Sequence, residues 1–260
     1  MKIIKHKKGQ FIILATLIVA VMIISIGTIM YSTVTYFRHE RWQEYLMVID
    51  NIELGSRRVV ELSLANYTIL NGTNNQILVN NLNNWRTNLT KAYPGFGIAL
   101  TYSATNGSHY AYGVNVSYSF GLARLWYNET SFSAANATFT LNLTSAGLTG
   151  YKFMATSFFR IRILNATNDD GTTIIILTAD VEELTPLLNL QKNKFEVQVN
   201  GETISSVNWT LKSARWSDEW GFFVYEIRCT SEMPLPPSYG VQVIAWDTRD
   251  IKVIANSTVT

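Results

Sequence analysis

One uncharged apolar stretch near the N-terminus constrains this chain more than any other feature. No Asp, Glu, Lys, Arg or His occurs between Gly9 and Phe37, and most of residues 11–37 are apolar. As a helix rising about 1.5 Å per residue, that segment would reach roughly 40 Å, which exceeds the hydrocarbon core of about 30 Å. A secretory signal would have a shorter apolar region and a small-x-small cleavage site, and neither is present. We therefore expect a transmembrane helix over residues 10–37 that the mature protein retains.

The charges around this stretch indicate its orientation. Four of the 21 basic residues (Lys2, Lys5, Lys7 and Lys8) precede it, so 17 basic and 19 acidic side chains remain for the rest of the chain. Basic residues beside a membrane span tend to stay in the cytoplasm. We expect a single-pass protein of the cell membrane with a cytoplasmic N-terminus and an extracellular C-terminal head. The slightly acidic remainder argues against a nucleic-acid partner.

The residues needed for catalysis are scarce. Cys229 is the only cysteine, and His109 is the only histidine beyond the stretch and its flanks. We find no nucleophile elbow, glycine-rich phosphate loop or helix with paired metal ligands. Asp169-Asp170 could supply half of a calcium site, but a polar hairpin turn is the favoured interpretation because no further ligand has metal-loop spacing. The sequence thus predicts no enzyme, no cofactor and no metal.

Helical periodicity continues over residues 38–93. One apolar face is formed by Trp42, Leu46, Ile49, Ile52 and Val59, with charged residues between them. Gly55-Ser56 is an expected bend or end of this helix. A second helix is predicted from about Asn74, and Pro94-Gly95 should end it.

The remainder alternates with a period of two, which is typical of β-strands. Few helical signals separate the strands, so we expect an α+β protein in which a long N-terminal helix precedes an antiparallel β-sandwich head. Two small β domains are predicted, residues 94–167 and 168–260, although one large sandwich remains an alternative. The expected strands are 98–103, 111–120, 137–144, 153–164, 172–179, 195–199, 207–211, 221–229, 241–247 and 251–255.

Asn-x-Ser/Thr sequons, the acceptor motifs for N-glycosylation, occur eleven times and only after residue 65. Composition alone would produce roughly four, so the excess favours a glycosylated extracellular face. A polar β protein rich in Asn and Thr is the competing explanation. The acceptors are Asn66, Asn71, Asn88, Asn106, Asn115, Asn128, Asn136, Asn142, Asn165, Asn208 and Asn256.

The residues directly before the apolar stretch, Lys7-Lys8-Gly9-Gln10, resemble the N-terminus of archaeal type IV pilin-like proteins, which carry a class III signal peptide. The resemblance covers about the first 40 residues. It implies a basic leader over residues 1–9 and a membrane-embedded prepilin-type peptidase that cuts between Gly9 and Gln10, with Lys8 as the preceding basic residue. The fifth mature position, commonly Glu in pilins, is Leu14 here.

The resemblance implies a structural or adhesive subunit of an archaeal cell-surface filament, with the membrane and like or related pilin subunits as partners. The alternative is a single-pass membrane anchor carrying an extracellular β-sandwich that binds a ligand without entering a filament. The abundant Tyr and Trp residues suit a surface glycan or a protein ligand, although core packing explains most of them. Processing at Gly9 and assembly distinguish the two hypotheses.

Overall fold

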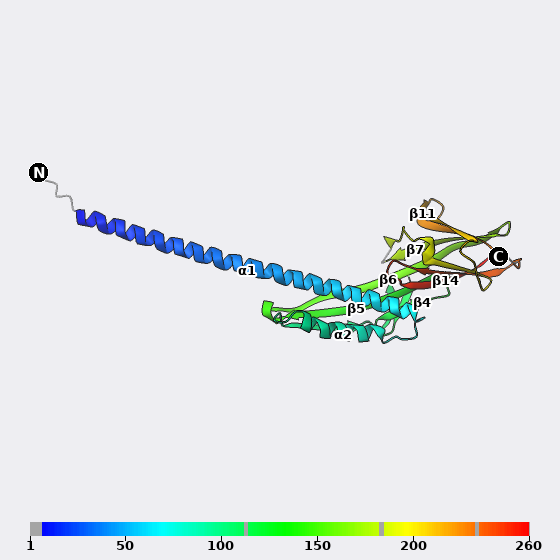
Figure 1. Cartoon of the computed structure of the whole chain (residues 1–260), viewed down its shortest axis with the longest axis horizontal. Coiled ribbons are helices and arrows are strands. Elements are labelled where there is room, and N and C mark those ends of the chain that lie inside the picture. The colour runs from blue at the N-terminus through cyan, green and yellow to red at the C-terminus, as the bar shows by residue number, and fades with distance from the viewer. Residues whose placement is uncertain (1–6, 112–113, 182–184, 232–233, 260) are drawn as a thin grey trace. The chain divides into compact units, whose positions relative to one another are not determined.

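The chain contains a long N-terminal helix and a mainly antiparallel β body (Figure 1). The computed structural model describes residues 7–111, 114–181, 185–231 and 234–259, and gives side chains for these except residues 7–13, 35–41 and 111. Two compact units are present, Met1–Asn51 and Ile52–Thr260. The first contains the beginning of helix α1 (Lys7–Ile69); the second contains the end of α1, helix α2 (Ile77–Ala92) and the strands.

The strands confirm an α+β chain whose β part follows its helices. Strands β1, β5, β6, β7, β12 and β11 lie in that order in the largest sheet, where β4 also pairs with β5 and β8 with β7. A second sheet has the order β10-β9-β13-β14, and β2 and β3 form a hairpin. The bounds are β1 (Ile98–Ala104), β2 (Gly107–Ala111), β3 (Val114–Tyr118), β4 (Leu122–Leu125), β5 (Thr130–Leu143), β6 (Leu148–Asp169), β7 (Thr172–Val181), β8 (Thr185–Pro186), β9 (Phe195–Val199), β10 (Glu202–Thr203), β11 (Trp209–Ser217), β12 (Phe222–Thr230), β13 (Tyr239–Trp246) and β14 (Lys252–Val259).

Helix α1 continues through Gly55-Ser56 to Ile69, so a helix end at this position is wrong. Gly55 is required by packing instead. A Cβ atom at this position would lie 2.4 Å from Cζ2 of Trp85 on α2. Ser56 donates a hydrogen bond to the carbonyl of Ile52 (2.7 Å) and accepts one from the Trp85 indole N–H (3.0 Å). A glycine and a small hydroxyl therefore let the two helices approach closely.

Replacing Gly55 by Leu should destabilise unit 2 by about 1–3 kcal/mol, because the new side chain occupies the space of the Trp85 ring and a packed core resists extra volume. Denaturant unfolding followed by fluorescence would measure the loss. Gly240→Leu is the matched control, since a Cβ atom there has no neighbour within 4 Å. Equal stability of the two variants would contradict the packing role of Gly55.

Helix α2 ends at Ala92, just before Pro94-Gly95, as predicted. Its residues Leu78, Leu82 and Leu89 are buried, as are Leu100 on β1 and Phe139 on β5. Helix α2 packs against β1. The hydroxyl of Tyr102 donates to the carbonyl of Val79 (3.2 Å), joining β1 to α2. These contacts form an α/β core at one end of unit 2.

At the other end, the two sheets share buried contacts. The hydroxyl groups of Thr173 on β7 and Tyr239 on β13 are 2.8 Å apart, and Ser133 on β5 donates to the carbonyl of Lys252 on β14 (2.6 Å). Both Thr173 and Ser133 are fully buried. Hydrogen bonds satisfy these polar groups where water is excluded.

The expected domain boundary at residues 168–171 is the turn between β6 and β7. Asp170 and Gly171 have positive φ, and the Gly171 amide donates to Oδ1 of Asn168 (3.0 Å). The strands on either side pair from Phe159–Val181 to Asp169–Thr172 within one sheet. The largest sheet is therefore continuous across the predicted boundary.

Asp247 anchors the turn between β13 and β14. Its carboxylate has no exposed surface and accepts hydrogen bonds from the amides of Arg249 (2.9 Å) and Ile251 (3.0 Å) and from Nε of Arg249 (2.7 Å). The Arg249 guanidinium also donates to the carbonyl of Phe158 on β6 (2.9 Å) and lies 3.4 Å from Glu61 on α1. One buried carboxylate thus organises a network linking three elements of unit 2.

Candidate functional site

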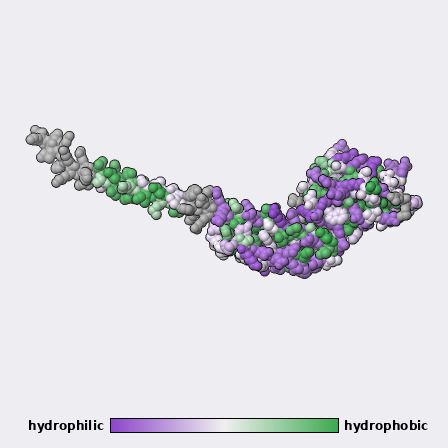
Figure 2. Space-filling view, viewed as in Figure 1, coloured by the Kyte–Doolittle hydropathy of each residue, from purple (hydrophilic) through white to green (hydrophobic). Residues whose placement is uncertain are grey.

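The apolar segment Leu14–Val34 of α1 is long and apolar enough to cross a membrane. Its side chains are exposed, for example Ile18 (49%) and Ile24 (68%), and Figure 2 shows hydrophobic residues covering the visible face of this part of the helix. A surface of this size and kind is unstable in water, so it requires lipid or protein around it.

Three hydroxyl groups near the C-terminal end of this segment are compatible with an apolar surrounding. Thr28 donates to the carbonyl of Ile24 (2.8 Å), while Thr33 and Ser32 donate to the carbonyl of Ile29 (2.8 and 3.0 Å). Polar groups in lipid or in a dry protein core must find their partners internally. These hydroxyls do so within their own helix, and therefore impose no demand for water.

The predicted processing residues Lys8, Gly9 and Gln10 lie in the first turn of α1, which begins at Lys7. Their side chains, and the leader residues 1–6, lie outside the described part of the chain. The structure therefore gives the backbone conformation at the predicted cleavage position but no side-chain geometry. Cleavage between Gly9 and Gln10 stays a prediction.

All eleven predicted glycosylation acceptors lie in described residues, and none is fully buried. Four are only partly exposed, namely Asn136, Asn142, Asn208 and Asn256. Asn136 differs from the others because its Oδ1 is buried without a hydrogen-bond partner. The seven exposed acceptors are Asn66, Asn71, Asn88, Asn106, Asn115, Asn128 and Asn165.

Glycopeptide mass spectrometry of the protein from native membranes should find glycans on several of the seven exposed acceptors and none on Asn136. The reason is access, because Asn136 lies in the middle of β5, where it is paired with Thr156 on β6 and its backbone bonds to Gly121 and Thr105 on the other side, and part of its side-chain amide is buried. Asn136 thereby serves as an internal control on the same chain. Modification of Asn136 with unmodified exposed acceptors would contradict this expectation.

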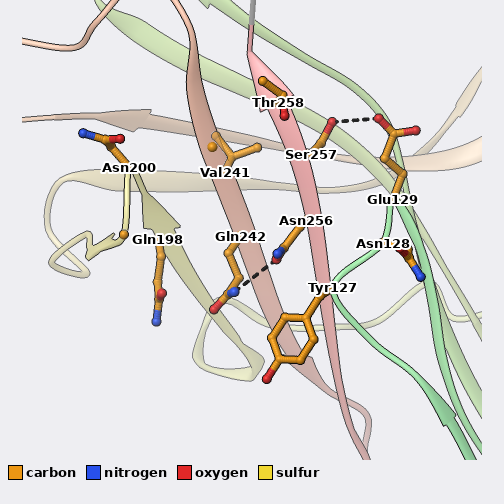
Figure 3. A pocket seen from close by; sticks show the side chains of 12 residues that line it. Tyr127, Asn128, Glu129, Gln198, Asn200, Val241, Gln242, Asn256, Ser257 and Thr258 are labelled. Atoms are coloured by element: carbon orange, nitrogen blue, oxygen red, sulfur yellow. Dashed lines mark hydrogen bonds between the residues drawn. The ribbon is translucent and has the colours of Figure 1, made fainter.

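A polar depression of about 580 Å³ lies where the second sheet meets the segment after β4 (Figure 3). The three strands contribute the amide groups of Gln198 on β9, Gln242 on β13 and Asn256 on β14, the connecting segments add those of Asn128 and Asn200, and Glu129 lies at one side. Gln242 donates to Oδ1 of Asn256 (3.1 Å), and Ser257 donates to a carboxylate oxygen of Glu129 (3.1 Å). These side chains are therefore partly preoriented.

Tyr127 presents an aromatic ring beside these amides. It is 57% exposed, and its φ of +69° is rare for a bulky residue. Its amide donates to the carbonyl of Ile254 (2.9 Å), which fixes the strained backbone against β14. An exposed ring with adjacent amides and a carboxylate can stack on and hydrogen-bond a polar ring compound such as a sugar.

Sequence reasoning did not single out this depression, apart from the acceptors Asn128 and Asn256 at its wall. Its residues come from four separate segments, each resembling an ordinary polar strand or turn. The positive φ of Tyr127 has no sequence signature, because it is a bulky residue in a position that usually takes Gly or Asn.

The described residues contain no group of three or more His, Cys, Asp or Glu side chains that could hold a metal ion. Asp169 and Asp170 are exposed in the β6–β7 turn, in keeping with the hairpin interpretation. His109 is exposed in β2. Burial raises the pKa of the Cys229 thiol to about 11, so this side chain stays protonated at neutral pH.

Comparison with known proteins adds no relative: no protein-family model matches the chain, and no curated protein matches it significantly.

Proposed function

We propose that this chain is a pilin-like subunit of an archaeal cell-surface filament. In this proposal a prepilin-type peptidase removes residues 1–9, the apolar part of α1 first anchors the protein in the cell membrane, and the glycosylated head lies outside the cell. The head would be a β-sandwich made from the two sheets, with a structural or adhesive role.

The observation that carries the proposal is the segment Leu14–Val34, which is apolar and exposed and which follows Lys8-Gly9 closely. Lipid is already apolar, so such a helix gains little from association inside the membrane. Extracted into a filament, it would pack beside identical helices away from water, where burial contributes about 25 cal/mol per Å². The same segment can therefore act first as an anchor and later as a filament core.

N-terminal sequencing and intact-mass measurement of the protein from native membranes test the proposal. We expect the mature chain to begin at Gln10 and to occur in filaments sheared from cells. A mature protein that still begins at Met1 would contradict processing by a prepilin-type peptidase. The anchored binding protein would then be the better description.

The depression in Figure 3 favours that second candidate, in which the chain is a membrane-anchored protein that binds a surface ligand. Exposed Tyr127 and the neighbouring amides of Gln242 and Asn256 suit a neutral sugar. Protease treatment of intact cells would remove the head under either proposal. Only the filament proposal expects the chain in the sheared fraction.

A further inference from the structure

A second pocket, distinct from the depression in Figure 3, lies on the outer side of the largest sheet. It has a volume of about 340 Å³. Its polar residues are Arg160 and Arg162 on β6 and Thr178 and Asp180 on β7, and its aromatic wall includes Phe222 at the start of β12. We call it the Arg162 pocket.

Two polar atoms of this pocket are buried without a hydrogen-bond partner in the described chain, Nε of Arg162 and Oγ1 of Thr178. The two residues face each other directly in the β6–β7 ladder, and Thr178 is only 3% exposed. A buried polar group without a hydrogen-bond partner destabilises the folded state. Two such groups on paired residues of one pocket are the arrangement that a bound polar ligand would satisfy.

The neighbouring charges do not satisfy Arg162. Asp180 is held by Arg160, whose Nη2 and Nε donate to Oδ2 of Asp180 at 2.9 and 3.1 Å. Arg162 instead places its guanidinium carbon 4.6 Å from the ring centre of Phe222. Stacking uses a face of the guanidinium and leaves its N–H edge for a planar anion such as a carboxylate.

The aromatic wall provides a surface for a ring. Phe222 and Trp216 are 42% and 55% exposed, and Trp216 is fixed by its edge contact with Phe223 (5.4 Å between ring centres) and by an indole hydrogen bond to Asp218 (2.9 Å). The volume lies at the small end of the usual range for ligand pockets, about 300–1,000 Å³, which suits one ring-sized group.

We propose that the Arg162 pocket binds an acidic sugar residue, a uronate, of a surface polysaccharide. The uronate carboxylate pairs with the N–H edge of Arg162, a sugar hydroxyl bonds to Thr178, and the C–H face of the ring lies on Phe222. An acidic peptide would satisfy Arg162 but would leave the aromatic wall without a ring. This proposal concerns binding by the head and does not depend on filament assembly.

In the test, the full chain in detergent micelles is titrated with trigalacturonate. Calorimetry and tryptophan fluorescence measure the binding. We expect saturable binding that Arg162→Gln weakens at least tenfold and Thr178→Val weakens several-fold. Arg228→Gln, which removes an exposed cation of β12 away from the pocket, should change the affinity less than twofold. Phe222→Leu provides a variant at an exposed position in case Arg162→Gln does not fold, and it should also weaken binding.

Methyl-esterified trigalacturonate should not bind, because it keeps the rings but lacks the carboxylates. The proposal is overturned if wild-type protein shows no saturable binding, if the ester binds as well as the acid, or if Arg228→Gln weakens binding as much as Arg162→Gln. Equal affinity for triglutamate would also overturn it and would identify a peptide site.

Discussion

A Gly9→Val variant should accumulate as uncleaved, membrane-bound protein with an exposed head, and cells carrying it should shed no filaments that contain this chain. Gly9 has no Cβ atom, so a peptidase at the membrane surface can approach the backbone before Gln10 closely. Valine branches at Cβ and would block this approach, while the apolar segment and the head remain intact. Intact-mass measurement of membranes and immunoblotting of the sheared fraction would detect both effects.

The matched control is Gly240→Val, the same exchange at an open position of β13. This variant should be processed and assembled like the natural chain. Undiminished filaments from the Gly9 variant would show that processing at this position is not needed. Absence of filaments from natural cells under every growth condition would favour the anchored binding protein.

Asp247→Asn should lower the free energy of unfolding by about 3–5 kcal/mol, a large share of the 5–15 kcal/mol typical of a folded domain. Asparagine retains one carbonyl oxygen for the backbone amides but loses the charge that holds Arg249. The partly buried Arg249 guanidinium would then keep only the Phe158 carbonyl (2.9 Å) and the Glu61 carboxylate (3.4 Å) as partners. Denaturant titration of the purified chain would measure the change.

Asp250→Asn is the matched control for this prediction, since it lies in the same turn. Its carboxylate is 65% exposed and pairs with Lys194 at 2.6 Å, and exposed pairs contribute at most about 1 kcal/mol. Asparagine also tolerates the positive φ of 62° at this position. Equal destabilisation by the two variants would contradict the organising role of Asp247.

Long periodic segments of the sequence predicted the corresponding elements well. The apolar run predicted the exposed segment of α1, Pro94-Gly95 predicted the end of α2, and strict alternation predicted β9 at the residues where it occurs. In each case a local pattern and the tertiary environment require the same conformation. The number of consecutive apolar residues alone gives a length sufficient to span a membrane. The prediction of a membrane-spanning helix therefore does not depend on the fold of the rest of the chain.

Strand ends and short strands were predicted less well. The segment expected at residues 111–120 contains the end of β2 and the whole of β3, and β4 was missed between the positive-φ pair Phe120-Gly121 and Trp126. Strand β5 begins before its predicted start at residue 137, and β6 extends beyond both predicted ends, because polar residues such as Asn136 and Asn165 continue the ladders. Pairing with neighbouring strands, which a single sequence does not reveal, overrides the weak local preference.

The pockets could not be predicted because strand register creates them. Arg162 and Thr178 are 16 positions apart, and each alone resembles an ordinary polar residue of a sheet. Only the β6–β7 register places them face to face. The Asn168–Gly171 turn was visible in the sequence, yet its composition is the same whether it separates two domains or closes a hairpin within one sheet.

The length of β6 has a mechanical consequence. This strand of 22 residues pairs with β5 as far as Arg162 and with β7 from Phe159 onward, so the two ladders overlap over only four of its residues. Tension applied along the strands would act perpendicular to the ladder hydrogen bonds. It would therefore load many of these bonds at the same time, in shear. Between Phe159 and Arg162 the strand is paired on both sides, and the β6 backbone of this segment transmits the load from the β5 ladder to the β7 ladder.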